Sequence, residues 1–375
     1  MASITKRSGS WQYRVSYKDK DGERQFVNKS GFPTKKAASL AAAEIERQYH
    51  RGADLSLHDT TLIEYWDKWL ALYKTGKHSR VTESRYKTIR KQLLAYWGLD
   101  RTLKSITKSD WQEFINGFGI GRAKDTVSKL NGYVRAMVDS AIDDQIVYSN
   151  FTHNTVLTGH AGKSRDLKYL EIADMKRLYD YCVEHASLRA LYNYIIAAGL
   201  KTGARYAEVI GLQWSDVDFD QGLLHINKTW DYMYGTGFKP TKTPSSVRDI
   251  EIPTGLAALL RQLKQQQAAD NLKKGYRDPL DLVFRNNRHE VPTNSAINKA
   301  LHQLEDVLGI QPRITFHGLR HSHVSYLIAQ GVDIYYISHR LGHSNIDITL
   351  RVYSHLLDDS RKAQAKIALK ALDAL

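Results

Sequence analysis

The chain has 375 residues, a length that suits two or three domains, and its 42% of hydrophobic residues exclude a fully disordered protein. The excess of 54 Lys and Arg over 40 Asp and Glu gives a net charge of +14, which favours a nucleic-acid partner over the alternative of a merely basic enzyme. No apolar stretch reaches the ~18 residues of a membrane span, and the N-terminal residues lack the apolar block of a signal peptide. The single cysteine, Cys182, excludes an internal disulfide framework, so we expect a cytoplasmic protein without a membrane partner and a Cys182 thiol in the core.

The first expected domain, residues 1–55, combines two strands with one helix. Residues 11–17 and 23–29 have the composition of strands, and Gly22 in the turn between them suits a positive φ. Thr34 can cap a helix that runs to about Tyr49. Basic residues in this domain favour a DNA-reading sheet over a mere packing appendage: they include Lys6, Arg7, Arg14, Lys18, Lys20, Arg24 and Lys29.

The second expected domain, residues 60–150, is helical. Apolar and aromatic residues recur at helical spacing between Tyr65 and Tyr73, and a run dense in Lys and Arg follows at 77–91. Taken alone, that run is typical of a solvated helix face. Residues 151–168 show little periodicity and are expected to form a linker.

The third expected domain, residues 169–375, is mixed α/β and mainly α. Helices fit 171–185 and 188–200, and strands fit 223–230 and 247–253 with a Gly- and Lys-rich loop between them. The remainder, apart from 280–295, is expected to be helical.

Two patches in the first half of this domain concentrate reactive side chains. In TGARYAEVIGLQWSDVD, residues 202–218, Arg205 opens a helix. In KPTKTPSSVRDIEIP, residues 239–253, Lys242 lies in the loop between the strands.

Two further patches follow near the end of the chain. In TFHGLRHSH, residues 315–323, Thr315 can cap a helix that carries His317 and Arg320 on one face. In ISHRLGHSNIDITLRVYSHL, residues 337–356, Gly342 ends a helix, His343 follows it, and Tyr353 lies on the next helix.

Taken in order, these motifs resemble the signature of the tyrosine recombinases, in particular the phage and conjugative-element integrases. That signature is an Arg in a T-G-x-R-x-x-E box, a Lys in a β-hairpin, H-x-x-R, L-G-H, and a Tyr about ten residues later. Each motif alone is weak, whereas all of them in order are specific. The resemblance implies six catalytic residues: Arg205, Lys242, His317, Arg320, His343 and Tyr353. The residues around the box arginine, Ala204 and Tyr206, differ mildly from those usual in the family. Glu208 is expected either to have a purely structural role or to support the arginine from behind.

The resemblance also implies the fold class and the activity. It implies a multidomain protein with a small β-sheet-plus-helix arm-type DNA-binding domain at 1–55, an all-α core-binding domain at 60–150 and a mixed α/β catalytic domain at 169–375. Such a protein cuts and rejoins DNA at specific sites through a 3′-phosphotyrosine intermediate, and thereby integrates or excises a mobile element. No cofactor is implied.

The residue types suit this chemistry independently of the resemblance. Arg205 and Arg320 can donate paired N–H bonds to phosphate oxygens, and Tyr353 can attack phosphorus to form a covalent intermediate. The two histidines can bond the same phosphate, and His317 can help to remove the tyrosine proton.

A lysine suits the acid that protonates the departing 5′-oxygen. Lys242 is preferred because K-T-x-x-S-x-R, which begins at Lys242, matches the family's hairpin. Lys239 and Lys228 are its nearby rivals.

Three other interpretations compete with a recombinase. The pairs His317/His321 and His339/His343 have the i,i+4 spacing of zinc ligands, but no Glu follows the first His of either pair and an Arg lies inside each span. A catalytically silent DNA-binding regulator with an integrase fold would not need the complete residue set. A type IB topoisomerase shares the chemistry, but the arm-like front domain favours an integrase.

The expected partner is double-stranded DNA at core and arm-type attachment sites. Arg14, on a strand of the first domain, is the expected arm-site contact. The Ala/Leu-rich tail at 358–375 is too short to form a stable helix unsupported, and the resemblance implies that it packs on a neighbouring protomer in a homotetramer on paired DNA sites. The resemblance also implies a directionality or DNA-bending factor as a further partner and action inside a bacterial host cell.

Overall fold

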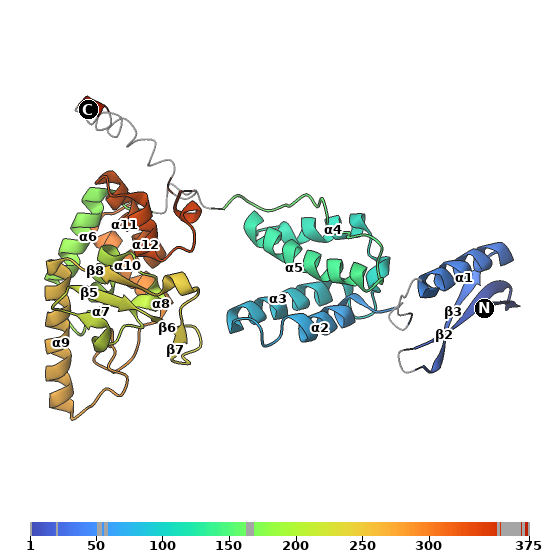
Figure 1. The fold of residues 1–375 in the computed structure, drawn as a ribbon, viewed down its shortest axis with the longest axis horizontal. Helices are drawn as coiled ribbons and strands as arrows, with labels where there is room; N and C mark the ends of the chain where they lie inside the picture. The colour runs from blue at the N-terminus through green and yellow to red at the C-terminus, as the bar shows by residue number, and fades with distance from the viewer. Residues whose placement is uncertain are drawn as a thin grey trace. The chain divides into compact units, whose positions relative to one another are not determined.

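A computed structural model describes residues 2–19, 22–50, 55, 59–162, 169–350, 353, 369 and 372–373. The chain divides into two compact units, residues 1–162 and 163–375 (Figure 1). Among the described residues, no helix is both long enough and apolar enough to cross a bilayer.

The N-terminal part of the first unit is a three-stranded antiparallel sheet with one helix against it. The sheet has the order β1 (Ser3–Arg7), β2 (Ser10–Lys18) and β3 (Arg24–Phe32), and α1 (Lys35–His50) follows. Alternate β2 residues Tyr13, Val15 and Tyr17 are buried in a core that includes Ala42 of α1. The expected second strand, turn and helix are confirmed, with Gly22 at φ +80°.

The strand β1 was not expected from the sequence. Its five residues are almost all exposed, so the sequence S-I-T-K-R carries no apolar alternation that would distinguish it from a loop. Pairing with β2 alone forms it, through the register Ser3↔Arg14 to Arg7↔Ser10.

The second part of the first unit is the expected helical bundle. It consists of α2 (Leu62–Tyr73), α3 (Arg80–Trp97), a 3₁₀ turn (Leu103–Ser105), α4 (Lys108–Gly119) and α5 (Lys124–Asp143). Thr61 and Glu64 form a reciprocal capping box at the start of α2. Its aromatic core is tied to polar partners, since Trp111 Nε1 donates to Asn131 at 2.8 Å.

Residues 151–162 of the expected linker lie instead against this bundle. Phe151 is buried, and the backbone of Val156 exchanges two hydrogen bonds with the Gln112 amide at 2.8 and 2.9 Å. Thr158 Oγ1 donates to the carbonyl of Ile115. Residues 151–162 lack periodicity because contacts with the bundle, and not a helix or strand of their own, fix their path. Residues 163–168 of the expected linker are outside the described residues.

The second unit surrounds α7 (Leu191–Thr202), a helix whose side chains are almost all buried. Its other helices are α6 (Ile172–Glu184), α8 (Tyr206–Val209), α9 (Thr254–Lys274), α10 (Asn294–Leu308), α11 (Phe316–Ala329) and α12 (Ile334–Leu341). Cys182 of α6 is in this core, as expected, and burial raises the pKa of its thiol to about 12.

Two small antiparallel sheets complete the second unit. One has the order β4 (Val217–Asp218), β5 (Leu223–Ile226) and β8 (Arg248–Glu251); the other pairs β6 (Lys228–Trp230) with β7 (Phe238–Pro240). The expected strand at 223–230 is thus two strands in different sheets, and the Gly- and Lys-rich loop contains β7 and a 3₁₀ turn (Pro244–Ser246). Strands of three residues are too short to give a periodic signal.

Candidate active site of the second unit

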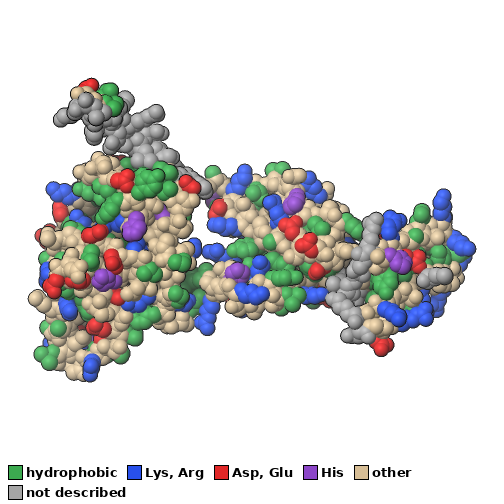
Figure 2. Space-filling model, viewed as in Figure 1, with side chains coloured by type: hydrophobic (Ala, Val, Ile, Leu, Met, Phe, Trp, Pro, Cys, Tyr) green, Lys and Arg blue, Asp and Glu red, His purple; other side chains and the backbone are tan. Residues whose placement is uncertain are grey.

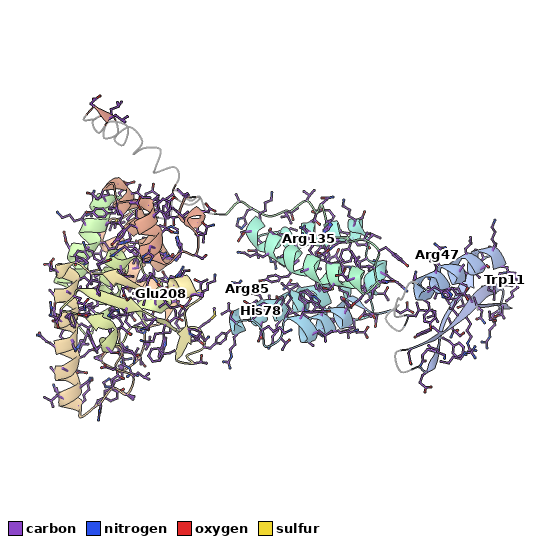
Figure 3. All side chains as sticks on the ribbon, in the orientation of Figure 1. Trp11, Arg47, His78, Arg85, Arg135 and Glu208 are labelled. Carbon is purple, nitrogen blue, oxygen red and sulfur yellow. The ribbon has the colours of Figure 1, made fainter. Side chains whose placement is uncertain are left out.

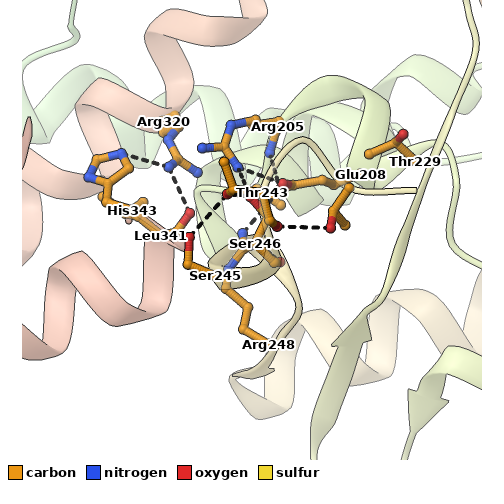
Figure 4. Close-up of polar contacts among 12 residues, drawn as sticks. Arg205, Glu208, Thr229, Thr243, Ser245, Ser246, Arg248, Arg320, Leu341 and His343 are labelled. Atoms are coloured by element: carbon orange, nitrogen blue, oxygen red, sulfur yellow. Dashed lines mark hydrogen bonds and ion pairs between the residues drawn. The ribbon is translucent and has the colours of Figure 1, made fainter. Parts of the chain in front are cut away.

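A buried carboxylate joins two arginines that belong to the sequence motifs of this unit. Arg205 is the N-cap of α8, and Glu208 returns to it: Glu208 Oε2 accepts the Arg205 backbone N–H at 2.8 Å and Oε1 accepts from Nη1 at 2.7 Å. Arg248, at the start of β8, donates from Nη2 to Glu208 Oε2 at 3.1 Å (Figure 4). Figure 3 shows Glu208 inside the unit, and its side chain is only 1% exposed.

The charges in this network settle the ionisation of Glu208. Burial alone raises the pKa of a carboxyl, but the charges and hydrogen bonds of Arg248 and Arg205 outweigh burial and lower the Glu208 pKa. Glu208 is therefore an anion that holds two guanidinium groups. The Arg205 side chain nevertheless stays 31% exposed, and among the described residues no hydrogen bond occupies its Nε or Nη2.

Arg320 approaches the same place from α11. Its Nη1 donates to the Gly203 carbonyl at 2.8 Å, and its Nη2 donates to the Leu341 carbonyl at 2.8 Å and to His343 Nε2 at 2.9 Å. Burial, followed by the charge of Arg205, lowers the pKa of Arg320 to about 9, which leaves it cationic at neutral pH.

His343 is neutral in this arrangement. Because its Nε2 accepts from Arg320, its proton is on Nδ1, which donates to Thr349 Oγ1 at 2.8 Å. Burial and the charges of Arg320, Arg205 and Arg248 lower the pKa of His343 to about 4.

Glycine allows the His343 loop to approach the hairpin that carries Arg248. Gly342 ends α12 at φ +67°, as expected, and a Cβ there would lie 3.0 Å from the Ser245 carbonyl oxygen and 3.1 Å from Arg248 Cδ. Arg248 Nε also donates to the Arg340 carbonyl at 2.6 Å. The T-G-x-R box and the L-G-H motif are therefore joined through Arg248.

Tyr353 lies close to this cluster without touching the arginines. Its side chain is 3% exposed and packs with Val324, Ile337 and Leu341, while its hydroxyl is 2.6 Å from Nδ1 of His321. Burial raises the Tyr353 pKa, and the charge of Arg320 opposes that increase. The phenol is accordingly protonated and held away from solvent.

The two histidines at the start of α11 occupy different environments. His317 is exposed, and its ring is 5.1 Å from that of His321, nearly perpendicular to it. His317 is close enough to His343 for its charge to lower the His343 pKa. In the described part of the chain, no group of three or more metal-ligating side chains is assembled.

Lys242 is exposed between β7 and β8, and within the described ranges it makes no hydrogen bond or ion pair. Its two rivals are both paired. Lys228 Nζ is 2.5 Å from Asp216, and Lys239 Nζ is 2.5 Å from Asp231. The structure thus assembles Arg205, Arg320, His343, His317 and Tyr353 and leaves Lys242 on a neighbouring loop.

Two members of the site carry no clear sequence signal. In the sequence, Arg248 is recognisable only as the final Arg of the K-T-x-x-S-x-R pattern. Its burial depends on contacts with Glu208 and Arg340, which are remote in sequence. In the sequence, His321 is notable only as one residue of the i,i+4 histidine pair His317/His321. Ala204 and Tyr206, the mild departures from the box, are buried core residues.

The sheet of the first unit offers a second candidate DNA surface. The face opposite α1 carries polar and basic side chains, and Figure 2 shows Lys and Arg on this part of the molecule. Arg14 is exposed on β2, and its guanidinium lies 3.7 Å from the ring centre of the 41% exposed Phe26 on β3. A guanidinium and an aromatic ring at one solvent-facing position suit base and phosphate contacts.

Chemically, the assembled cluster suits an anionic phosphate. Arg205 and Arg320 provide fixed cationic donors, the neutral His343 adds a further polar group, and a tyrosine hydroxyl is nearby. Preorganised donors of this kind stabilise the charge that develops on phosphoryl oxygens.

Two family models match this chain. The phage integrase family matches residues 168–360, and the arm DNA-binding domain matches residues 3–49. Among curated relatives, the tyrosine recombinase XerC-like protein of Caldanaerobacter subterraneus subsp. tengcongensis is 26% identical over 94% of each chain. The transposase from transposon Tn916 of Enterococcus faecalis is 26% identical over 95% of this chain and 91% of its own.

Solved structures share the fold. The Tn1549 transposon integrase in complex with a circular intermediate DNA matches with a TM-score of 0.69 at 19% identity, covering 82% of this chain and 99% of that one. A lambda integrase tetramer bound to a Holliday junction matches with a TM-score of 0.58 at 16% identity, over 91% and 95%. The expected fold class is confirmed, and the chain belongs to the phage integrase family, the tyrosine-type site-specific DNA recombinases, with an arm DNA-binding domain at its N-terminal end.

Proposed function

We propose that Tyr353 is the nucleophile of this recombinase and that Arg205 and Arg320 hold the scissile phosphate. The observation that supports this assignment most strongly is the convergence of both guanidiniums, through Glu208 and the Gly203 and Leu341 carbonyls, on one place near a tyrosine hydroxyl. The unused Nε and Nη2 of Arg205 suit paired bonds to non-bridging oxygens.

In the proposed reaction, the Tyr353 oxygen forms a bond to phosphorus while the bond from phosphorus to the 5′-oxygen breaks. His317 accepts the phenol proton, and Lys242 gives a proton to the departing 5′-hydroxyl. For His343 to donate to the same phosphate, Arg320 must release His343 Nε2 and that nitrogen must gain a proton, by a change of tautomer or by protonation of the ring. Rejoining is the reverse, because the phosphotyrosine conserves the bond energy.

The same proposal requires Tyr353 to leave its hydrophobic site. The Tyr353 hydroxyl bonds His321 and its ring packs on Val324 and Leu341, so attack on a phosphate held by Arg205 would break these contacts. DNA binding supplies the free energy for this rearrangement in the proposed scheme.

Tyr353→Phe tests the nucleophile. We expect binding of a core-site duplex to change by less than about twofold, because one hydroxyl contributes little to a large basic interface. We expect no covalent protein–DNA adduct on denaturing gels, with or without EDTA. Tyr336→Phe, which alters an exposed tyrosine elsewhere in the unit, is the control and should retain the adduct. An adduct in the Tyr353 variant would overturn the assignment.

Lys242→Ala tests the acid. We expect cleavage to slow by about 10²-fold or more on ordinary DNA, which is the usual contribution of a general acid. A substrate with sulfur at the bridging 5′ position needs no proton, so its cleavage should recover. Lys239→Ala and Lys228→Ala are matched controls because both lysines are held by carboxylates, and neither should show this sulfur rescue. Rescue in a control variant would transfer the role to that lysine.

The arm domain is proposed to bind separate arm-type DNA sites through the sheet face that carries Arg14. Arg14→Ala should weaken arm-site binding and lower the salt dependence of the affinity by about one ion. Cleavage of an isolated core site should be unchanged. Arg47→Ala, on the α1 helix rather than the sheet, is the control. Equal arm-site affinity in the Arg14 variant and the wild-type protein would exclude this surface.

Assembly as a tetramer on two paired sites is also proposed, with the tail at 358–375 passed to a neighbouring protomer. Most of this tail lies outside the described residues, but Leu369 and Leu372 are 61% and 63% exposed. Two exposed leucines in an Ala/Leu-rich tail favour docking on another surface. The lambda relative forms a tetramer on a Holliday junction. We also propose that the protein acts on bacterial DNA in the cytoplasm, together with a directionality or DNA-bending factor.

Leu369→Glu with Leu372→Glu tests the tail. We expect normal binding of one site and at least about tenfold fewer tetrameric complexes on native gels, since two charges would enter an apolar contact. Leu272→Glu is the control, because Leu272 is 86% exposed on α9. If the double variant formed tetramers normally, the tail would dock on its own protomer and the proposal would be wrong.

A further inference from the structure

The helix α10 holds the backbone that leads into the active-site helix α11. Asn298, His302 and Glu305 are spaced four and three residues apart and share one face of α10. Asn298 Oδ1 accepts the Phe316 N–H at 2.7 Å, His302 Nε2 donates to the Ile314 carbonyl at 3.0 Å, and Glu305 Oε1 accepts the Ile314 N–H at 3.0 Å.

These bonds act on the residues directly before His317. Phe316 is the first residue of α11, and the Thr315 side chain makes no capping bond there. The start of the helix is therefore fixed by side chains of α10 in place of its own cap. His317 and Arg320 lie within the first turns of α11, so a displacement of residues 314–316 would displace both.

Glu305 is an unusual member of this set. Its side chain is fully buried, and none of the described residues forms a hydrogen bond with its Oε2. An ionised carboxylate with an unpaired, buried oxygen costs more free energy than a protonated carboxyl in the same place. Burial accordingly raises the pKa of Glu305 to about 7.

The charged groups around Glu305 do not compensate its ionisation. Arg313, in the loop after α10, lowers the Glu305 pKa, but it pairs with Asp306, whose charge raises it. From α6, Arg177 donates to the Leu308 carbonyl and pairs with Asp174. The side chains that α7 buries are uncharged, and on α11 the buried Arg320 is bonded to Gly203, Leu341 and His343.

We propose that Glu305 is a positioning residue for the recombination reaction, which in its protonated form fixes residues 314–316 and thereby the placement of His317 and Arg320. Loss of its proton strengthens the bond from the Ile314 N–H to Oε1 but places a charge on the unpaired Oε2 in the core, and the rearrangement that solvates this charge loosens the segment. Because the folded chain holds the proton more tightly than the unfolded chain, stability falls as the pH rises from the unfolded pKa to about 7 and is then level. Correct placement is lost over the upper part of this range, through about pH 7.

The test compares Glu305→Gln with the wild-type protein. Glutamine keeps the acceptor for the Ile314 N–H and cannot ionise. Single-turnover cleavage of a nicked core-site duplex is measured from about pH 6 to 8.5, and the ratio of wild-type to variant rates removes the titration of every group that both proteins share. We expect this ratio to be constant in acid and to fall about threefold or more around pH 7. Glu184→Gln, which changes an exposed glutamate on α6, is the control and should give a level ratio.

A second readout does not depend on cleavage. Hydrogen exchange of the peptide 310–317 in the wild-type chain, corrected for the intrinsic effect of pH, should accelerate several-fold through pH 7 and should be level in Glu305→Gln. It distinguishes failure of this inference from failure of the proposed catalytic roles and needs only the wild-type protein if the variant does not fold. Level exchange, or a Gln variant slowed equally at every pH, would overturn the proposal.

Discussion

The structure of the second unit around Arg205 depends on the ion pairs of the buried Glu208 carboxylate with two arginines. This carboxylate is the anion between Arg205 and Arg248, and through Arg248 it fixes the hairpin against the Arg340 carbonyl and Gly342. Removing a partner from a buried ion pair is strongly destabilising because the remaining charge is uncompensated. In this chain two guanidiniums would be left, so Glu208 determines both the position of Arg205 and the integrity of the loops around it.

Elsewhere in the site, polar side chains also form hydrogen bonds with one another. Arg320 donates to His343, and the Tyr353 hydroxyl pairs with His321. These bonds remove the cost of burying unpaired polar atoms, and they also hold groups in arrangements that differ from those of the reaction. In the proposed reaction, a phosphate that binds here replaces some of these hydrogen bonds, and recognition of DNA is thereby coupled to assembly of the reactive geometry.

Much of this architecture follows from local sequence, and the remainder depends on contacts between distant residues. The end of α12 at Gly342 follows from a helix-capping rule, and the order of six motif residues indicated the family. Glu305 could not be recognised, because a Glu on an amphipathic helix normally faces solvent and its burial depends on the loop at 309–315. His321 could not be assigned to Tyr353, since 32 residues separate them and only the packing of α11 with its neighbours joins them.

The close approach of Gly342 to the hairpin has a consequence for how this family of sequences can diverge. A Cβ at 342 would lie 3.0 Å from the Ser245 carbonyl oxygen and 3.1 Å from Arg248 Cδ, so a larger residue there would require the hairpin to move. The loop that carries His343 and the hairpin that begins near Lys242 must therefore be inherited as a matched pair. Grafting either one from a distant relative would fail unless the other were exchanged with it, even if every motif residue were retained.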